Sequence, residues 1–312
     1  MTIGKILSLT IKELETCGIL TADLDVRLML EDILNKDSSY FFSHPEAPIS
    51  NPAYQKFRRL IKRRKKGEPV AYLLGWKEFY GLRFKVNKNV LIPRPETEAI
   101  VDETIAYLKS QNSNLKNSSL NVLDIGTGSG AIIITLAKTL KYNNIRYFAL
   151  DVSEKALKIA KLNAMSNNVD DQISFYKSDL LTNPRIPKNI DIILANLPYI
   201  PFCHSEQSEE SHHQQNKYHK KLSPDPSLPQ DDKRLSFEPQ NALFADKKGL
   251  DLIEKLIIQI SERSYKPKLI ILEIFEDHPE PIRKLVEQYL PKYRFEVKKD
   301  YAGLNRLIIL TI

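Results

Sequence analysis

From Leu120 onward, short apolar segments alternate with longer segments of helical spacing, and this alternation constrains the fold more than any other feature. Such a pattern predicts a mostly parallel sheet with helical crossovers, an α/β fold. The final segments, 294–299 and 306–312, are expected to close the sheet as a hairpin-like pair. The other expected strands are 121–125, 146–151, 173–177, 190–195 and 268–274, and the expected helices are 130–140, 154–168, 249–264 and 281–290.

The first part of the chain has helical spacing only, and we assign residues 1–76 to a small N-terminal helical domain. Its apolar pattern predicts three helices, the second near 22–34 and the third near 52–66. A β-hairpin linker at 77–93 then opens a second domain, 77–312, and Thr97 is expected to N-cap a helix over 98–109.

The third helix is strongly basic. Two interpretations stay open, a solvated face or a docking surface for an acidic partner or RNA. The basic residues are Arg58, Arg59, Lys62, Arg63, Arg64, Lys65 and Lys66.

The bulk composition fits a soluble globular protein, with a net charge of +7 that is too small by itself to establish nucleic-acid binding. Cys17 and Cys203 are far apart and form no CxxC pair, which favours a reducing compartment. No stretch approaches the ~20 apolar residues of a membrane span, so we expect a cytoplasmic protein without a membrane partner.

One polar segment, 203–233, has almost no apolar residues and is expected to be an insertion. It combines Cys203 with four histidines, but their spacing matches no strong zinc pattern, so no metal is expected. The histidines are His204, His212, His213 and His219.

A glycine-rich turn, Asp124-Ile-Gly-Thr-Gly-Ser-Gly130, follows a predicted strand and opens a helix. Its glycines allow the backbone to approach a ligand closely. Because the spacing is not G-x-G-x-x-G and the acid Asp124 would repel pyrophosphate, the turn suits the cationic S-adenosylmethionine better than a dinucleotide.

Further acids end the next two strands. Asp151 is placed to accept the ribose hydroxyls and Asp179 to accept the adenine amino group. Three acids at consecutive strand ends predict S-adenosylmethionine as the cofactor.

The fourth strand ends in Asn196-Leu197-Pro198-Tyr199. The Asn196 side-chain oxygen and the Leu197 carbonyl can both accept hydrogen bonds from a planar –NH2 group. Pro198 stiffens the turn, and Tyr199 offers a flat face for stacking on an amide or a base. We therefore expect methyl transfer to a planar amino nitrogen, with Asn196 and Tyr199 as catalytic residues.

The motifs GEPVAYLLGWKEFYGLRFKVNKNVLIPRPETE, DIGTGSGA, NLPY, FEPQNALFADKKGLD and DYAGLNR together resemble the release-factor glutamine methyltransferases, the PrmC/HemK family. The resemblance implies a Rossmann-like, seven-stranded class I methyltransferase domain after a helical domain and a hairpin linker. It also implies methylation of the glutamine in the Gly-Gly-Gln motif of peptide chain release factors, without a required nucleic acid, with the basic helix as part of the release-factor docking surface.

The resemblance also implies roles for individual residues. Leu180 would lie beside the adenine and Asp151 would bind the ribose, while Asn196 would lie at the junction of cofactor and substrate. Residues 196–199 would hold the glutamine. The methionine part of the cofactor would be lined by Gly126, Thr127, Gly128, Ser129 and Gly130.

The sequence departs from the family pattern at several positions. Leu197 replaces the usual proline but keeps the needed carbonyl, Leu180 replaces an aromatic residue of some members, and Phe275 stands where glycine is frequent.

Two alternatives are weighed against this prediction. An adenine amino methyltransferase acting on RNA or DNA would use the same chemistry, and NLPY also occurs in ribosomal RNA adenine dimethylases. Those enzymes lack the IPRPETE and FEPQNAL segments. A non-catalytic module that keeps the cofactor fold is the second alternative, and it predicts no cofactor binding.

Overall fold

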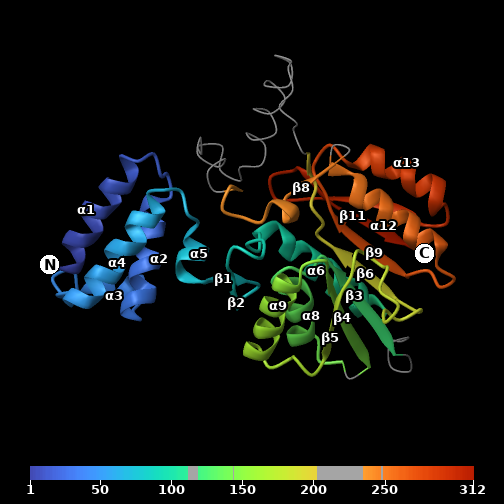
Figure 1. Cartoon of the computed structure of the whole chain (residues 1–312), viewed down its shortest axis with the longest axis horizontal. Coiled ribbons are helices and arrows are strands. Elements are labelled where there is room, and N and C mark those ends of the chain that lie inside the picture. The colour runs from blue at the N-terminus through green and yellow to red at the C-terminus, as the bar shows by residue number, and fades with distance from the viewer. Residues whose placement is uncertain (112–118, 143, 202–234, 247–248) are drawn as a thin grey trace, which may run out of the picture. The chain divides into compact units, whose positions relative to one another are not determined.

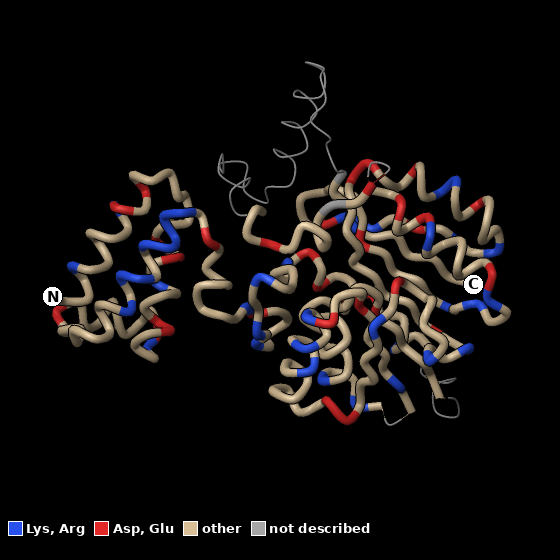
Figure 2. The backbone as a smooth tube through the Cα atoms, in the orientation of Figure 1, with Lys and Arg blue, Asp and Glu red and all other residues tan. Residues whose placement is uncertain are grey.

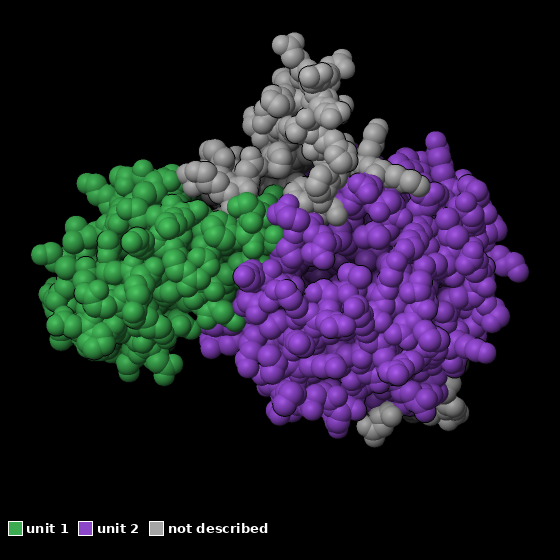
Figure 3. Space-filling model, in the orientation of Figure 1, with its two compact units in different colours: residues 1–75, 203–238 green, residues 76–202, 239–312 purple. Residues whose placement is uncertain are grey.

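The structure, a computed structural model, describes residues 1–111, 119–142, 144–201, 235–246 and 249–312. It divides into two compact units, residues 1–75 with 203–238 and residues 76–202 with 239–312 (Figures 1 and 3). The segment 203–233, including its cysteine and histidines, falls within 202–234 and lies outside the described residues. No helix in the described ranges combines the length and apolar character needed to cross a bilayer.

The first unit contains the three expected helices, α1 (Ile3–Glu15), α2 (Ala22–Leu34) and α4 (Asn51–Arg64). Two short helices that the sequence did not predict, α3 (Ser38–Ser43) and α5 (Val70–Leu74), lie between and after them. They were missed because one or two turns give too few residues for a periodic pattern.

The basic segment of the first unit is largely paired internally. Arg64 is buried and donates to Asp25 at 2.7 Å, with both side chains at most 7% exposed. Arg58 and Lys65 both bind Glu13, and Arg63 binds Glu68. Only Arg59, Lys62 and Lys66 of the predicted basic surface are exposed and unpaired among the described residues.

The second unit opens with the predicted hairpin, β1 (Trp76–Phe79) and β2 (Leu82–Lys85). Tyr80 and Gly81 join the strands with positive φ angles of 52° and 71°, the pattern of a type I′ turn. A 3₁₀ turn, η1 (Pro95–Thr97), runs directly into α6 (Glu98–Ser110).

The seven-stranded sheet confirms the predicted α/β fold. The strand order is β10-β11-β9-β6-β3-β4-β5, and β11 is antiparallel to its two neighbours while the pairs from β9 to β5 are parallel. The strands are β3 (Leu120–Ile125), β4 (Ile145–Asp151), β5 (Ile173–Lys177), β6 (Ile192–Ala195), β9 (Leu269–Glu273), β10 (Arg294–Lys299) and β11 (Asn305–Thr311). Each lies within a residue or two of its predicted position, and β10 and β11 form the expected hairpin.

Helices cover both faces of the sheet (Figure 1). Alternate strand residues divide into two cores: Val122 and Leu194 pack with α6 and α8, whereas Leu123 and Ile193 pack with α12 and α13. This alternation is the period-two pattern of a strand buried on both sides. The helices of this layer arrangement are α8 (Ala131–Thr139), α9 (Glu154–Ser166), α12 (Asp251–Glu262) and α13 (Pro279–Tyr289).

The chain order reverses between β3 and β6. From β3 the chain continues to β4 and β5 on one side, and it then returns to β6 on the other. The carboxyl ends of strands at such a switch point form the usual ligand-binding crevice of an open α/β sheet. The turns after β3 and β6 therefore occupy the position where a site is expected.

Candidate active site

The glycine-rich turn after β3 is held in place by its neighbours. Thr127 donates its backbone N–H to the carbonyl of Leu150 at 2.8 Å, and Gly128 donates its N–H to Asp151 Oδ2 at 2.9 Å. Gly126 has a φ of +72°, and a Cβ on it would lie 3.2 Å from Leu197 Cδ2. Glycine is needed here both for the left-handed backbone and for this close approach.

Below the turn, Asp124 is a fully buried carboxylate. Its Oδ2 accepts a hydrogen bond from Thr127 Oγ1 at 2.6 Å, while Oδ1 has no hydrogen-bond partner among the described residues. Burial, reinforced by the charge of Asp151, raises the pKa of Asp124 to about 7. An orphaned buried carboxylate oxygen suits a cationic ligand.

Asp151, at the end of β4, is tied to the same turn. Its Oδ2 accepts from Gly128 and its Oδ1 accepts from Ser153 N at 2.8 Å. Burial raises the pKa of Asp151, and the two amide bonds oppose this shift. A carboxylate oxygen has two lone pairs, so each oxygen retains capacity for a further donor.

The third predicted acid has a different environment. Asp179 is exposed and forms an ion pair with Lys255 of α12 at 2.5 Å. Leu180, beside it, is buried against the α12 and α13 core and has a φ of +49°. The structure thus places Asp124 and Asp151 next to the glycine-rich turn. Asp179 instead lies at the surface, in an ion pair with Lys255.

The turn after β6 lies against the glycine-rich turn. Leu197 is buried and contacts Gly126, while Asn196, Pro198 and Tyr199 are partly buried. Gly249 supports the turn from the other side, because a Cβ there would lie only 2.0 Å from the Tyr199 carbonyl oxygen. The chain continues into β7 (Ile200–Pro201), which pairs with β8 (Phe244–Ala245).

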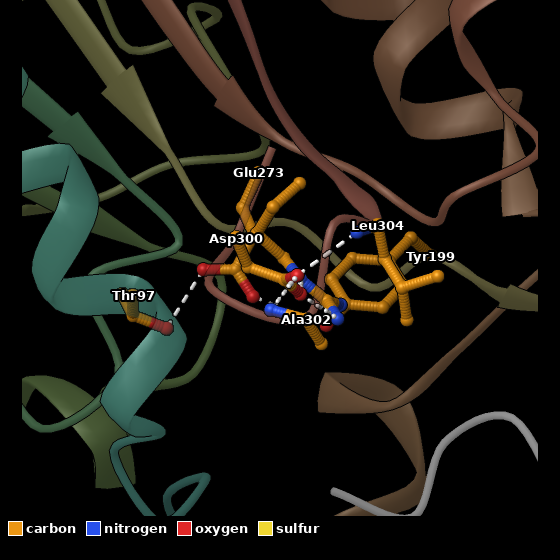
Figure 4. Close-up of polar contacts among 7 residues, drawn as sticks. Thr97, Tyr199, Glu273, Asp300, Ala302 and Leu304 are labelled. Atoms are coloured by element: carbon orange, nitrogen blue, oxygen red, sulfur yellow. Dashed lines mark hydrogen bonds and ion pairs between the residues drawn. The ribbon is translucent and has the colours of Figure 1, made fainter. Parts of the chain in front are cut away.

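A hydrogen-bond network that the sequence did not predict orients this turn. Glu273, at the end of β9, accepts from Thr97 Oγ1 at 2.7 Å and from the Tyr199 hydroxyl at 3.1 Å (Figure 4). Asn196 Nδ2 in turn donates to Thr97 Oγ1 at 3.1 Å. Thr97 lies at the expected N-cap position of α6, but its side chain makes no capping hydrogen bond: its backbone is helical and its hydroxyl serves this network instead.

Glu273 is 1% exposed, and burial raises its pKa, whereas Thr97, Tyr199 and the charge of Arg306 oppose the shift. The sequence contains one signal for Glu273: it is an acid that ends the otherwise apolar strand Leu-Ile-Ile-Leu-Glu. Asp124 and Asp151 have the same kind of position near a strand end.

A tight turn after β10 lies beside the network (Figure 4). Asp300 Oδ1 accepts from the amides of Ala302 and Leu304 at 2.9 and 3.0 Å, and its Oδ2 accepts from Arg306. Tyr301 projects from this turn fully exposed.

The hairpin of β1 and β2 is hydrogen-bonded to the glycine-rich turn through Asn163 of α9. Its Nδ2 donates to the carbonyls of Ser129 and Lys85, and its Oδ1 accepts from Lys85 N.

In the described part of the chain, no group of three or more His, Cys, Asp or Glu side chains is arranged to hold a metal ion.

Comparison with protein families identifies both units. Residues 5–75 match the PrmC N-terminal domain, and residues 116–229 match a methyltransferase domain. The chain is also similar in fold to the hMettl16 catalytic domain solved with the MAT2A 3′UTR hairpin 1, with a TM-score of 0.53, 16% identity and coverage of 92% of this chain and 91% of that one.

Curated relatives extend the similarity over nearly the whole sequence. The release factor glutamine methyltransferase of Koribacter versatilis is 30% identical over 99% of this chain and 98% of its own length. That of Coxiella burnetii is 32% identical over 93% and 91%. The bifunctional methyltransferase of Rickettsia conorii is 32% identical over 99% of this chain, which spans 58% of that protein. The chain belongs to the release factor glutamine methyltransferase family.

Proposed function

We propose that this protein transfers a methyl group from S-adenosylmethionine to the side-chain amide nitrogen of the glutamine in the Gly-Gly-Gln motif of peptide chain release factors. The observation that carries the proposal is the orientation of Asn196. Its Nδ2 is engaged by Thr97, which leaves Oδ1 as an acceptor, and its backbone carbonyl oxygen lies beside the glycine-rich turn, 3.7 Å from where a Cβ on Gly126 would be.

The residues of the glycine-rich turn fit the cofactor. The orphaned Asp124 Oδ1 supplies a negative charge for a cationic group, and Asp151 retains lone pairs for the ribose hydroxyls. Gly126 keeps its surface open to close approach, and residues 126–130 would line the methionine part. We assign Leu180 to the adenine pocket. Asp179 would bind the adenine amino group only by sharing its carboxylate with Lys255.

In the substrate half, Asn196 Oδ1 and the Leu197 carbonyl would accept the two N–H bonds of the glutamine amide, and Tyr199 would stack on its plane. Holding the amide this way fixes the nitrogen and weakens its conjugation with the carbonyl group. The cofactor would supply an electrophilic methyl group for the nitrogen that Asn196 Oδ1 and the Leu197 carbonyl hold, and the proton that this nitrogen gives up would pass to solvent water. Catalysis then depends mainly on positioning and charge placement.

The first unit supports a protein substrate. Arg59, Lys62 and Lys66 are exposed and unpaired among the described residues, and Lys and Arg residues recur along the backbone of α4 (Figure 2). We propose that these three cations form the docking surface for an acidic patch of the release factor, a narrower surface than the sequence suggested. A cytoplasmic location belongs to the same proposal, because the substrate is a translation factor.

The adenine alternative is not favoured by the curated relatives, which carry the release factor name over nearly the full chain. The likeness to hMettl16 concerns the fold alone. A non-catalytic module is disfavoured by the intact arrangement of Asp124, Asp151 and Asn196 around the two turns.

The test uses purified full-length protein, methyl-labelled S-adenosylmethionine and a release factor, either wild type or with the Gly-Gly-Gln glutamine replaced by alanine. We expect label in the wild-type factor only. A parallel reaction replaces the release factor with ribosomal RNA, and label entering the RNA but not the factor would assign the activity to adenine. Absence of cofactor binding by calorimetry would support a non-catalytic module.

A further inference from the structure

Glu273 is a buried acid with no assigned part in methyl transfer, although it touches two elements of the site. It ends β9, the neighbour of β6, so its carboxylate lies level with the turn that follows β6. Its two oxygens accept from different segments of the chain, Oε2 from Thr97 and Oε1 from Tyr199 (Figure 4).

The direction of each hydrogen bond follows from the chemistry of the groups. An ionised carboxylate only accepts, so Thr97 must direct its single hydroxyl proton to Glu273. The Thr97 oxygen then has only lone pairs to offer, and the Asn196 side chain must present its NH2 group to it. Asn196 Oδ1 is consequently turned away from Thr97. With Glu273 ionised, this network permits a single orientation of the Asn196 amide.

We propose that Glu273 and Thr97 are positioning residues that fix the amide orientation of Asn196, so that an acceptor and not a donor faces the glutamine –NH2 group. This inference rests on the proposed function of Asn196. A flipped Asn196 would present N–H groups to the N–H groups of the substrate, and that arrangement is repulsive.

The relay requires Glu273 to be ionised. The groups that face it are Thr97 and Tyr199 as donors, Arg306 as a favourable charge and Glu96 as an unfavourable one. Burial raises the pKa of Glu273, so kcat should rise with pH as this carboxyl loses its proton. A protonated Glu273 would donate to one of its partners and release the constraint on Thr97.

The test compares two substitutions at Thr97 with one matched control. Thr97→Val removes the hydroxyl and keeps the shape, while Thr97→Ser keeps the hydroxyl. Thr104→Val makes the same change at a buried threonine of α6, whose hydroxyl binds the Ile100 carbonyl within its own helix.

We expect Thr97→Val to lower kcat on the order of 10²-fold, with the KM for S-adenosylmethionine and the melting temperature close to those of Thr104→Val. Thr97→Ser should stay within about threefold of wild type, since the hydroxyl relay is restored. Glu273→Gln should also lower kcat, because its amide can donate to Thr97 and reverse the relay.

An unchanged kcat in Thr97→Val would overturn the inference, as would equal losses in Thr97→Ser and Thr97→Val. Failure of the wild-type protein to label the glutamine would instead overturn the proposed function, so the two failures are separable.

Discussion

Gly126 and Leu197 are in contact although they belong to different turns: a Cβ on Gly126 would lie 3.2 Å from Leu197 Cδ2. The first turn is the proposed cofactor site and the second is the proposed substrate site. The Leu197 side chain therefore lies between the two turns, and it is buried in the core. This packing couples the position of the second turn to that of the first.

Asn196→Ala removes the proposed acceptor of the substrate amide. We expect kcat to fall on the order of 10²–10³-fold, the scale of losing one preorganised polar group in an active site. Cofactor affinity should be largely retained, since Asp124 and Asp151 are untouched. Rates come from label transfer and affinity from calorimetry. An active variant would remove Asn196 from its proposed role.

Asp151→Ala should weaken S-adenosylmethionine binding by about 1.5–3 kcal/mol, on the order of 10–100-fold in Kd, because a charged acceptor is lost. Asp179→Ala provides the contrast. Its carboxylate is exposed and engaged by Lys255, so we expect a loss below about 1 kcal/mol. Calorimetric titration of both variants measures which one loses more affinity for S-adenosylmethionine. The reverse order would mean that the ribose lies elsewhere.

Asp124 should make the cofactor-free protein less stable as the pH rises. Its pKa is raised from 3.8 to about 7, so the folded state holds an extra proton between these values. The resulting stabilisation is fully present below pH 3.8 and is lost as the pH rises through 7. The total is about 4 kcal/mol, an upper estimate from the shift.

Asp124→Asn removes this titration and keeps the shape. Denaturant unfolding of both proteins between pH 4 and 8 measures the effect, and wild type should lose stability relative to the variant as the pH rises. A difference that is independent of pH would contradict the raised pKa.

Gly249→Ala should impair catalysis from outside the two turns. The new Cβ would meet the Tyr199 carbonyl oxygen at 2.0 Å, so the turn must shift. Gly81→Ala is the matched control, because its φ is also positive but nothing lies within 4 Å of the added atom. Both variants should lose about 1–2 kcal/mol of stability from backbone strain, and only Gly249→Ala should lose kcat. Equal kcat values in the two variants would refute the argument.

The exposed cations of the first unit should act on substrate affinity alone. Changing Arg59, Lys62 and Lys66 together to glutamine should raise the KM for a release factor about tenfold at low salt, and less at high salt because exposed charges are screened. The matched control changes three exposed lysines of α9, Lys155, Lys158 and Lys161. A similar rise in KM in the control would attribute the effect to net charge.

Most of the fold was predictable because its strands and helices have distinct hydrophobic periods. Strand β5 was placed to the residue, and β3 and β4 within one residue, since each begins with an apolar residue and is mostly apolar. The short helices α3 and α5 and the strands β7 and β8 are too short to carry a period, and they depend on tertiary contacts.

The position of the candidate site residues was predictable where they follow strand ends in sequence, as with Asp124, Asp151 and Asn196. It was not predictable where residues meet across the fold. Thr97 lies 176 positions from Glu273 and 99 from Asn196, and only the sheet order brings them together. The capping rule failed at Thr97 because a buried acceptor competes for its hydroxyl.

The turn from Asp300 to Leu304 lowers the conformational entropy that would be lost when another molecule binds Tyr301. Both oxygens of Asp300 are occupied by the turn's own amides and by Arg306, so the backbone that carries Tyr301 is already ordered. The tyrosine ring has only two side-chain torsions to restrict. Binding of a molecule to this fully exposed ring would therefore cost little conformational entropy in the turn and the side chain. More of the free energy of the contact would remain as binding affinity.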